Sequence, residues 1–137
     1  MRLSVVVPAY NEELRIQRTL ERLAEYYDAQ EYDYDVAIIS DGSTDRTNVI
    51  VEEFAASHPK FTLVKSEPNQ GKGSVVRLGM LRASGDYVLF CDADLATPQE
   101  ETEKLLPRVM QGTDIAIGSR PLRESSLQVR QPWLREM

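Results

Sequence analysis

The sequence has little of several features that would assign it to particular classes of protein. Its one cysteine, Cys91, excludes a disulfide within the chain and lies in an apolar run, so we expect a packed thiol and a reducing, cytoplasmic compartment. No stretch reaches the roughly 18 apolar residues of a membrane span, and the N-terminus lacks the basic-then-apolar order of a signal peptide. The sequence therefore predicts a soluble protein, or one that is at most peripheral to a membrane.

Basic residues are also scarce. The 16 Lys and Arg residues are outnumbered by 22 Asp and Glu residues, which gives a net charge of -6. This balance argues against nucleic acid as a partner, because a polyanion requires a dense basic surface that displaces its counterions. It does not exclude a small phosphate ligand, which a few local cations, backbone N–H groups and a metal ion can hold.

Hydrophobic periodicity predicts an alternation of strands and helices. Short apolar runs are expected as buried strands, and longer segments with apolar residues at helical spacing as amphipathic helices. Asn11 is the expected N-cap of the first helix, Leu14 is one of its apolar positions, and Pro98 is expected in the first turn of the fourth helix. The expected strands cover residues 3–8, 36–39, 61–64, 87–91 and 114–117, and the expected helices residues 12–27, 49–54, 74–83 and 98–109.

This alternation predicts an α/β fold with a mostly parallel sheet and helices on both faces. In such a sheet the loops at the carboxyl ends of the strands share one edge, where ligands bind. Candidate functional residues follow each of the five expected strands. In chain order they are Tyr10 and Glu12, Asp41, residues 69–73, Asp92 with Asp94, and Arg120.

The sequence Asp92-Ala93-Asp94 is the most informative of these candidates. Carboxylate oxygens are hard ligands that suit Mg²⁺ or Mn²⁺ and do not suit zinc. Magnesium keeps most of its coordination sphere as water and substrate phosphate, so one or two protein carboxylates are enough. The alternative interpretation is a solvated turn, but Lys72 on the neighbouring loop favours a site for a metal ion and a diphosphate.

Two cations are expected to meet phosphate at this edge. Lys72 lies between Gly71 and Gly73 at the start of a helix, where backbone N–H groups, the helix dipole and the ammonium group can converge on phosphate oxygens. The spacing is not that of a P-loop. Arg120 follows the fifth expected strand and can bind a phosphate through two parallel hydrogen bonds. The alternatives are a flexible surface turn for Lys72 and a surface charge for Arg120.

The loops after the first two strands carry groups that suit a nucleoside. Tyr10 and Glu12 can flank a base and accept its N–H or a ribose hydroxyl, and Asp41 comes directly off a buried strand. Asp45 falls in the first turn of the next helix and is expected to stabilise it, with a hydroxyl at position 43 or 44 as the N-cap. The alternative for the first loop is a turn with two acids near a helix N-terminus.

Together these motifs resemble those of the family 2 glycosyltransferases, which are inverting enzymes with the Rossmann-like GT-A nucleotide-sugar fold. The resemblance covers nearly the whole chain, and its finer details are most similar to polyprenyl-phosphate and dolichyl-phosphate glycosyltransferases of the glucosyl type. It rests on five segments in the same order: Pro8-Ala-Tyr-Asn-Glu-Glu13, Ser40-Asp-Gly-Ser-Thr-Asp45, Asn69-Gln-Gly-Lys-Gly73, Asp92-Ala-Asp-Leu95 and Gly118-Ser-Arg120.

The resemblance implies a role for each matching residue. Asp92 and Asp94 would be the metal-binding and catalytic residues, with Mg²⁺ or Mn²⁺ as the cofactor. A UDP-sugar, or alternatively a GDP-sugar, would be the donor, and a lipid phosphate such as polyprenyl phosphate the acceptor. The metal and the cations would stabilise the departing nucleoside diphosphate while the acceptor oxygen attacks the opposite face of the anomeric carbon. The implied substrate-binding residues are Pro8, Ala9, Tyr10, Glu12, Asp41, Lys72, Asp92, Ala93 and Arg120.

Departures from the family pattern refine these expectations. Mannosyl-phosphate synthases of this group usually carry Gln two residues after the second Asp, where this chain has Ala96, so glucose is the expected sugar. Family members continue well beyond the Gly-Ser-Arg segment with acceptor-binding elements and often the catalytic base. We therefore expect a fold truncated after its donor-binding half, with residues 1–120 as the donor-binding domain and residues 121–137 as the start of the acceptor side or a disordered tail.

Other interpretations remain at this stage. The mixture of Arg with apolar residues over positions 120–135 suits a peripheral contact with an anionic membrane surface, or equally an unpaired edge of a larger fold. A nucleotide-binding module without transfer activity is the main alternative function. A signalling receiver domain has the same alternation but requires an acidic pair after the first strand and an Asp after the third, where this chain has Tyr10-Asn-Glu-Glu13 and Ser66-Glu-Pro-Asn69.

Overall fold

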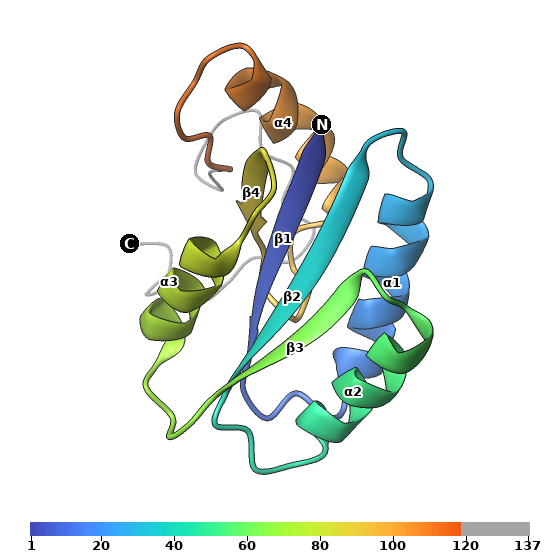
Figure 1. Cartoon of the computed structure of the whole chain (residues 1–137), viewed down its shortest axis with the longest axis vertical. Helices are drawn as coiled ribbons and strands as arrows, with labels where there is room; N and C mark the ends of the chain where they lie inside the picture. The colour runs from blue at the N-terminus through green and yellow to red at the C-terminus, as the bar shows by residue number, and fades with distance from the viewer. Residues whose placement is uncertain (119–137) are drawn as a thin grey trace. The chain divides into compact units, whose positions relative to one another are not determined.

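A computed structural model of the chain describes residues 1–118 as alternating strands and helices (Figure 1). This order confirms the predicted α/β alternation. The elements are β1 (Arg2–Ala9), α1 (Ile16–Asp28), β2 (Asp33–Asp41), α2 (Thr47–Ser57), β3 (Phe61–Ser66), α3 (Lys72–Arg82), β4 (Tyr87–Phe90), a 3-10 helix (Gln99–Glu101) and α4 (Thr102–Met110).

The strands form a parallel sheet in the order β3-β2-β1-β4. At its centre Val5 of β1 lies opposite both Val36 of β2 and Leu89 of β4. A strand between two parallel neighbours is covered on both faces, and every residue of β1 from Leu3 to Ala9 is buried. The predicted parallel sheet is therefore confirmed, and its strands deliver their carboxyl ends to one edge.

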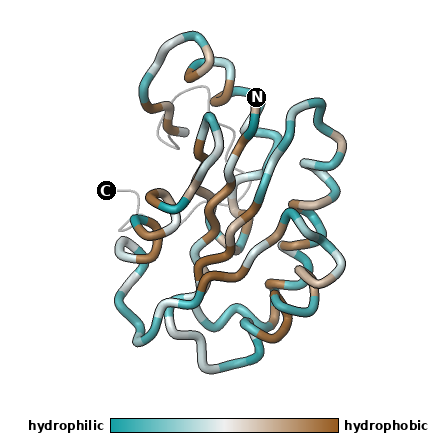
Figure 2. The backbone as a smooth tube through the Cα atoms, in the orientation of Figure 1, coloured by the Kyte–Doolittle hydropathy of each residue, from teal (hydrophilic) through white to brown (hydrophobic). Residues whose placement is uncertain are grey.

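Helices cover both faces of this sheet. The chain steps from β1 through α1 and α2 to β3 in one direction and returns through α3 to β4 on the other side of β1. Because such crossovers are right-handed, α1 and α2 share one face and α3 lies on the other (Figure 1). The α3 helix packs closely, since a Cβ atom on Gly79 would overlap the side chain of Val6. Figure 2 shows the hydrophobic residues gathered along the central strands.

The start of the first helix differs from the prediction. The α1 helix begins at Ile16, and the N-cap residue Arg15 makes no side-chain cap hydrogen bond. Asn11 is not a helix cap, because its φ is +48° and its side chain binds the loop after β2. Leu14 lies in the turn before the helix and is exposed. Apolar spacing does not reveal that the chain turns here to bring polar groups against the neighbouring loop.

The fifth expected strand is also wrong within the described part of the chain. Residues 115–118 have no regular secondary structure, and both Ile115 and Ile117 are exposed. An apolar alternation becomes a strand only where a neighbouring strand supplies hydrogen bonds, and the described sheet pairs none with this segment. Pro98 does not begin an α-helix either, because the 3-10 helix precedes α4, and Pro107 lies inside α4.

The chain divides into two compact units, Met1–Gln99 and Glu100–Met137. The first holds β1 to β4 and α1 to α3, and the second includes α4. The donor-binding domain expected over residues 1–120 stays a prediction, and the region expected at 121–137 lies outside the described residues. Within residues 1–118, none of the helices combines the length and the apolar character needed to cross a membrane.

Candidate functional site

The predicted site residues follow the carboxyl ends of the four strands, at the lower end of the sheet in Figure 1. Pro8 and Ala9 are buried within β1, opposite residues of β2, whereas Tyr10 is half exposed just beyond the strand. Pro8 and Ala9 are therefore buried beneath this edge of the sheet, whereas the ring of Tyr10 is accessible to a ligand. Arg120, the expected phosphate-binding residue after the fifth strand, lies outside the described residues.

Reciprocal hydrogen bonds join the first loop to the second. The amide oxygen of Asn11 accepts from the backbone N–H of Thr44 at 2.8 Å, and the N–H of Asn11 donates to Ser43 Oγ at 3.2 Å. The N–H of Glu13 donates to Asp45 Oδ2 at 3.1 Å. A positive φ is tolerated better by Asn than by most residues, which explains its place at this bend. Hydrogen bonds in both directions therefore join the two loops.

Asp45 stabilises the start of α2 as expected, but it lies before the helix, which begins at Thr47, and not in its first turn. Its Oδ1 atom accepts from the N–H of Thr47 at 2.9 Å, and Thr47 Oγ1 in turn accepts from the N–H of Glu12 at 2.8 Å. Burial acts to raise the pKa of Asp45, but the hydrogen bonds from Thr47 and Glu13 outweigh it and lower the pKa. The expected cap at position 43 or 44 is wrong, because those residues bind the first loop instead.

Asp41 holds the loop that leads into α3. Its side chain is 3% exposed, and its oxygens accept from the N–H groups of Gln70 at 2.8 Å and Gly71 at 2.9 Å and from Asn69 Nδ2 at 3.2 Å. The adjacent Gly42 has a φ of +67°, and a Cβ there would lie 2.7 Å from the backbone N of Asn69. The carboxylate predicted to contact a nucleoside thus makes three hydrogen bonds to the third loop.

The Asp92-Ala93-Asp94 segment forms a turn that presents both carboxylates. Asp92 and Asp94 are exposed, while Ala93 and Leu95 are buried. The N–H of Leu95 donates to the Asp92 carbonyl at 3.1 Å, and the N–H of Ala96 donates to Asp94 Oδ1 at 3.0 Å. The turn therefore alternates buried apolar residues with exposed acids, so both carboxylates are accessible to a ligand at this edge of the sheet.

Lys72 brings a cation to this turn. Its Nζ atom forms an ion pair with Asp92 Oδ1 and lies 5.3 Å from the centre of the Phe90 ring. Both charged side chains remain about half exposed. The residue precedes Gly73 at the start of α3, and Gly71, at the N-cap, has a φ of +95°. The predicted proximity of Lys72 to the carboxylate pair is present in the structure.

Glu12 faces the other acids of the edge. Its Oε2 atom is buried and makes no hydrogen bond, although Arg15 Nε lies 2.6 Å away as an ion-pair partner. Burial raises the pKa of Glu12, the Arg15 charge opposes this effect, and the charges of Asp94 and Asp45 add to it. The first, second and fourth loops thus influence one another electrostatically, and a cation at this place would relieve their mutual repulsion.

The residues present fit a metal ion that is shared with a substrate. Asp92 and Asp94 supply hard carboxylate oxygens. Residues 1–118 contain no group of three His, Cys, Asp or Glu side chains that could enclose a metal. An ion held by this edge would therefore take most of its ligands from water and from a diphosphate, which is how Mg²⁺ is usually bound.

Sequence patterns did not reveal one residue that supports this turn. Thr19 of α1 is buried, and its hydroxyl donates to the carbonyl oxygen of Ala93 at 2.6 Å. The signal that would have found it is a polar residue among the apolar positions of an amphipathic helix. The Cys91 thiol just before the turn is partly buried, and burial with the nearby Asp92 charge raises its pKa to about 12.

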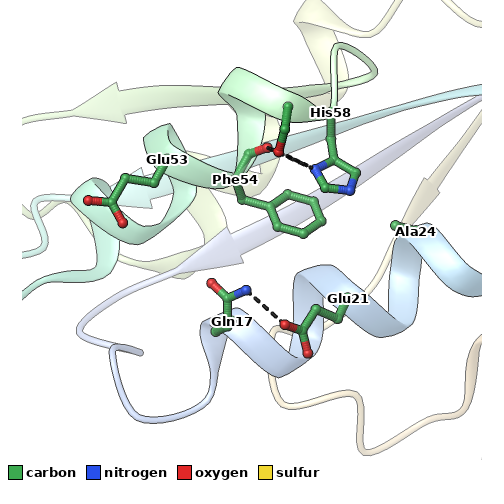
Figure 3. Close-up of a pocket in the computed structure, with 7 residues that line it drawn as sticks. Gln17, Glu21, Ala24, Glu53, Phe54 and His58 are labelled. Atoms are coloured by element: carbon green, nitrogen blue, oxygen red, sulfur yellow. Dashed lines mark hydrogen bonds between the residues drawn. The ribbon is translucent and has the colours of Figure 1, made fainter.

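A separate groove of about 470 Å³ lies between α1 and α2 (Figure 3). The ring of His58 stacks on that of Phe54 at 3.8 Å, and His58 Nδ1 is 3.0 Å from the Phe54 carbonyl oxygen. His58 directly follows the last residue of α2, so this contact lies at the C-terminus of the helix. None of the predicted site residues within positions 1–118 lines the groove, whose walls are Gln17, Glu21, Ala24, Glu53, Phe54, Ser57 and His58.

Comparison with known proteins supports a single family. The family described as Glycosyl transferase family 2 matches residues 4–134. Dolichyl-phosphate beta-glucosyltransferase ALG5D of Trichomonas vaginalis is 34% identical to this chain, and the alignment covers 98% of this chain and 44% of that protein. The chain thus spans less than half the length of this relative.

Two solved structures share the arrangement of strands and helices. The mannosyltransferase PcManGT from Pyrobaculum calidifontis, in complex with GDP-Man and Mn2+, is 32% identical and has a TM-score of 0.64, over 74% of this chain and 30% of that chain. TarS of S. aureus, in complex with UDP-GlcNAc, is 34% identical and has a TM-score of 0.60, over 69% of this chain and 27% of that chain. Since family, sequence and fold agree over most of its length, this chain belongs to glycosyl transferase family 2 and has the GT-A fold.

Proposed function

We propose that this chain binds a nucleotide-sugar, with its diphosphate and a Mg²⁺ or Mn²⁺ ion at the carboxyl edge of the sheet. The observation that carries this proposal is the ion pair between Lys72 and Asp92, which brings a cation of the third loop to the carboxylate pair of the fourth. Carboxylates for a metal and an ammonium group for phosphate are the two parts of a diphosphate site. Because both partners are about half exposed, a ligand can reach them.

Each loop has a distinct task in this proposal. Asp92 and Asp94 hold the metal, which when bound neutralises the charge that develops on the nucleoside diphosphate as it leaves. Lys72 turns from Asp92 toward a phosphate oxygen. Tyr10 offers its exposed ring to the base. Asp41 fixes the third loop and so determines where Lys72 stands.

For the whole protein we propose transfer of glucose from UDP-glucose to a lipid phosphate such as polyprenyl phosphate, with inversion at the anomeric carbon. The name of the Trichomonas vaginalis relative supports glucose and a lipid-phosphate acceptor. Ala96 supports glucose over mannose by the family pattern. A phosphate acceptor is already ionised near neutral pH and needs no strong base. Such an acceptor would bring the protein to the cytoplasmic face of a membrane.

Nucleotide binding without transfer is a second candidate for the chain itself. It is favoured by the extent of the match, because the chain spans 44% of the relative's length. The two candidates share the donor site and differ in whether an acceptor is used, so they are separated by measuring turnover as well as binding.

Calorimetry with UDP and with GDP, each with and without Mn²⁺, tests the donor site. We expect binding that depends on Mn²⁺. Asp94→Ala removes a metal ligand and should weaken this binding at least about tenfold, which corresponds to about 1.4 kcal/mol. Glu31→Ala is the matched control, since it removes an exposed carboxylate from the turn between α1 and β2. Unchanged binding in Asp94→Ala contradicts the metal assignment.

A transfer assay with UDP-glucose and polyprenyl phosphate tests the reaction. Formation of glucosyl polyprenyl phosphate by the chain supports the first candidate. Binding of UDP with no product supports the second. If GDP binds with Mn²⁺ and UDP does not, the proposed donor base is wrong.

A further inference from the structure

A buried hydroxyl interrupts the apolar face of α1. Among the buried residues of this helix, Thr19 stands between the apolar Ile16, Leu20 and Leu23, and it is 4% exposed. Burial of a hydroxyl is unfavourable unless the group makes a hydrogen bond. Valine has the same shape as threonine but no hydroxyl to bury. A threonine at this position is therefore explained only if its hydroxyl has a hydrogen-bond partner.

The partner belongs to the turn that carries the two acids. Thr19 Oγ1 lies 2.6 Å from the carbonyl oxygen of Ala93 and 3.2 Å from that of Arg15, one helical turn earlier. The Arg15 carbonyl already accepts from the N–H of Thr19 at 3.1 Å. A hydroxyl has one proton to donate, and the shorter contact is the tertiary one. The bond therefore joins α1 to a residue 74 positions later in the chain.

This bond holds the centre of the turn. Ala93 lies between the exposed acids Asp92 and Asp94, so an anchor on its carbonyl fixes the peptide group that orients Asp94. The next residue, Leu95, is buried and has a φ of +50°, a conformation that a non-glycine residue keeps only where its surroundings enforce it. Thr19 and the burial of Leu95 thus hold the turn from below.

We propose that Thr19 is a positioning residue for the metal–diphosphate site: its hydroxyl holds the Asp92-Ala93-Asp94 turn so that both carboxylates face the ligand. The inference rests on the proposed function for the identity of that ligand. Thr19 touches neither metal nor substrate and acts through the carbonyl of Ala93. Carboxylates that bind a metal must be held to within about 0.5 Å by the residues beneath them, which is the task assigned to this hydroxyl.

Amide hydrogen exchange tests the anchor without any ligand. The N–H groups of Leu95 and Ala96 report on the turn, because both are bonded within it. We expect Thr19→Val to accelerate their exchange about fivefold and Thr19→Ser to restore it, since a net hydrogen bond of about 1 kcal/mol corresponds to roughly this ratio. If Thr19→Val does not fold, Thr19→Ala is measured instead.

A second buried hydroxyl provides the control. Ser4 Oγ donates to Asp35 Oδ1 at 2.8 Å and accepts from the N–H of Gly85 at 2.9 Å, at the amino end of the sheet. Ser4→Ala should lower the melting temperature and leave the two turn amides protected once global stability is matched. Equal acceleration in both variants, or none in Thr19→Val, overturns the inference.

Binding of Mn²⁺ and UDP completes the test. We expect Thr19→Val to weaken Mn²⁺-dependent UDP binding about three- to tenfold, with recovery in Thr19→Ser and no change in Ser4→Ala. Wild-type affinity in Thr19→Val overturns the positioning role even if the proposed function holds. If the wild type itself binds no nucleotide, the proposed function fails, and the exchange rates alone then support or overturn the anchor.

Discussion

Replacing Asp41 by asparagine tests the connection between the second and third loops. The buried carboxylate accepts hydrogen bonds from the backbone N–H groups of Gln70 and Gly71 and from the side chain of Asn69. Asparagine has the same shape but carries an NH₂ group in place of one oxygen, and this group cannot accept. At least one donor of the third loop therefore loses its partner and faces another donor.

The expected loss of stability follows from these contacts. A hydrogen bond to a charged group contributes about 1.5–3 kcal/mol, and a buried donor without a partner costs about 1–3 kcal/mol. Because Asp41→Asn removes the charge and leaves one backbone N–H unpaired, we expect the free energy of unfolding to fall by about 2–4 kcal/mol. For a domain of about 100–150 residues this corresponds to a fall of roughly 8–16 °C in the melting temperature.

Urea unfolding followed by circular dichroism measures this change. Asp86→Asn is the matched control, because Asp86 accepts a single exposed backbone hydrogen bond from Arg2, and we expect it to cost less than about 1 kcal/mol. A free energy of unfolding for Asp41→Asn within about 0.5 kcal/mol of the wild type would refute the reasoning. It would show that the third loop does not depend on Asp41 in solution.

Three further predictions concern packing, the cation and pH. Gly79→Ala should lower the free energy of unfolding by about 2 kcal/mol or more because α3 meets β1 there, whereas Gly73→Ala, which meets no atom within 4 Å, should not; thermal unfolding compares them. Lys72→Met should change stability by less than about 1 kcal/mol, since its ion pair with Asp92 is exposed, yet weaken Mn²⁺-dependent UDP binding about tenfold in calorimetry. Burial raises the pKa of Glu12 above 4.5, so the ionised carboxylate lowers the stability of the folded protein at neutral pH. Glu12→Gln should therefore be more stable than the wild type at pH 7. Urea unfolding should show this difference in stability shrinking as the pH falls through the folded pKa toward 4.5.

The arrangement of strands could be predicted because its signal is local. A run such as Val5-Val6-Val7 is apolar on both faces of an extended chain, and this suits only a strand covered on both sides. The same kind of signal misled at Ile115 and Ile117, since an apolar alternation does not specify whether a neighbouring strand is present. It also misled at Leu14, which has helical spacing and yet lies in a turn.

The site was predictable as an edge and a set of chemical groups. Asp92, Asp94 and Lys72 were expected together because parallel strands end on one side, and the ion pair between Lys72 and Asp92 bears this out. The task of Asp41 was less accessible, because its hydrogen bonds reach residues 28–30 positions later. The roles toward a substrate or metal remain predictions for all the site residues: Pro8, Ala9, Tyr10, Glu12, Asp41, Lys72, Asp92, Ala93, Asp94 and Arg120.

The sequence by itself determined the kind of fold, the order of its elements and the chemistry at the strand ends, because each depends on residue types a few positions apart. Only the tertiary structure decided which polar groups share hydrogen bonds. Asn11 became a link between two loops, and Thr19 an anchor for a turn 74 positions away. A hydrogen bond forms only when its donor and acceptor atoms lie about 3 Å apart. For residues that are far apart in the sequence, only the packing of the folded chain brings the two atoms so close.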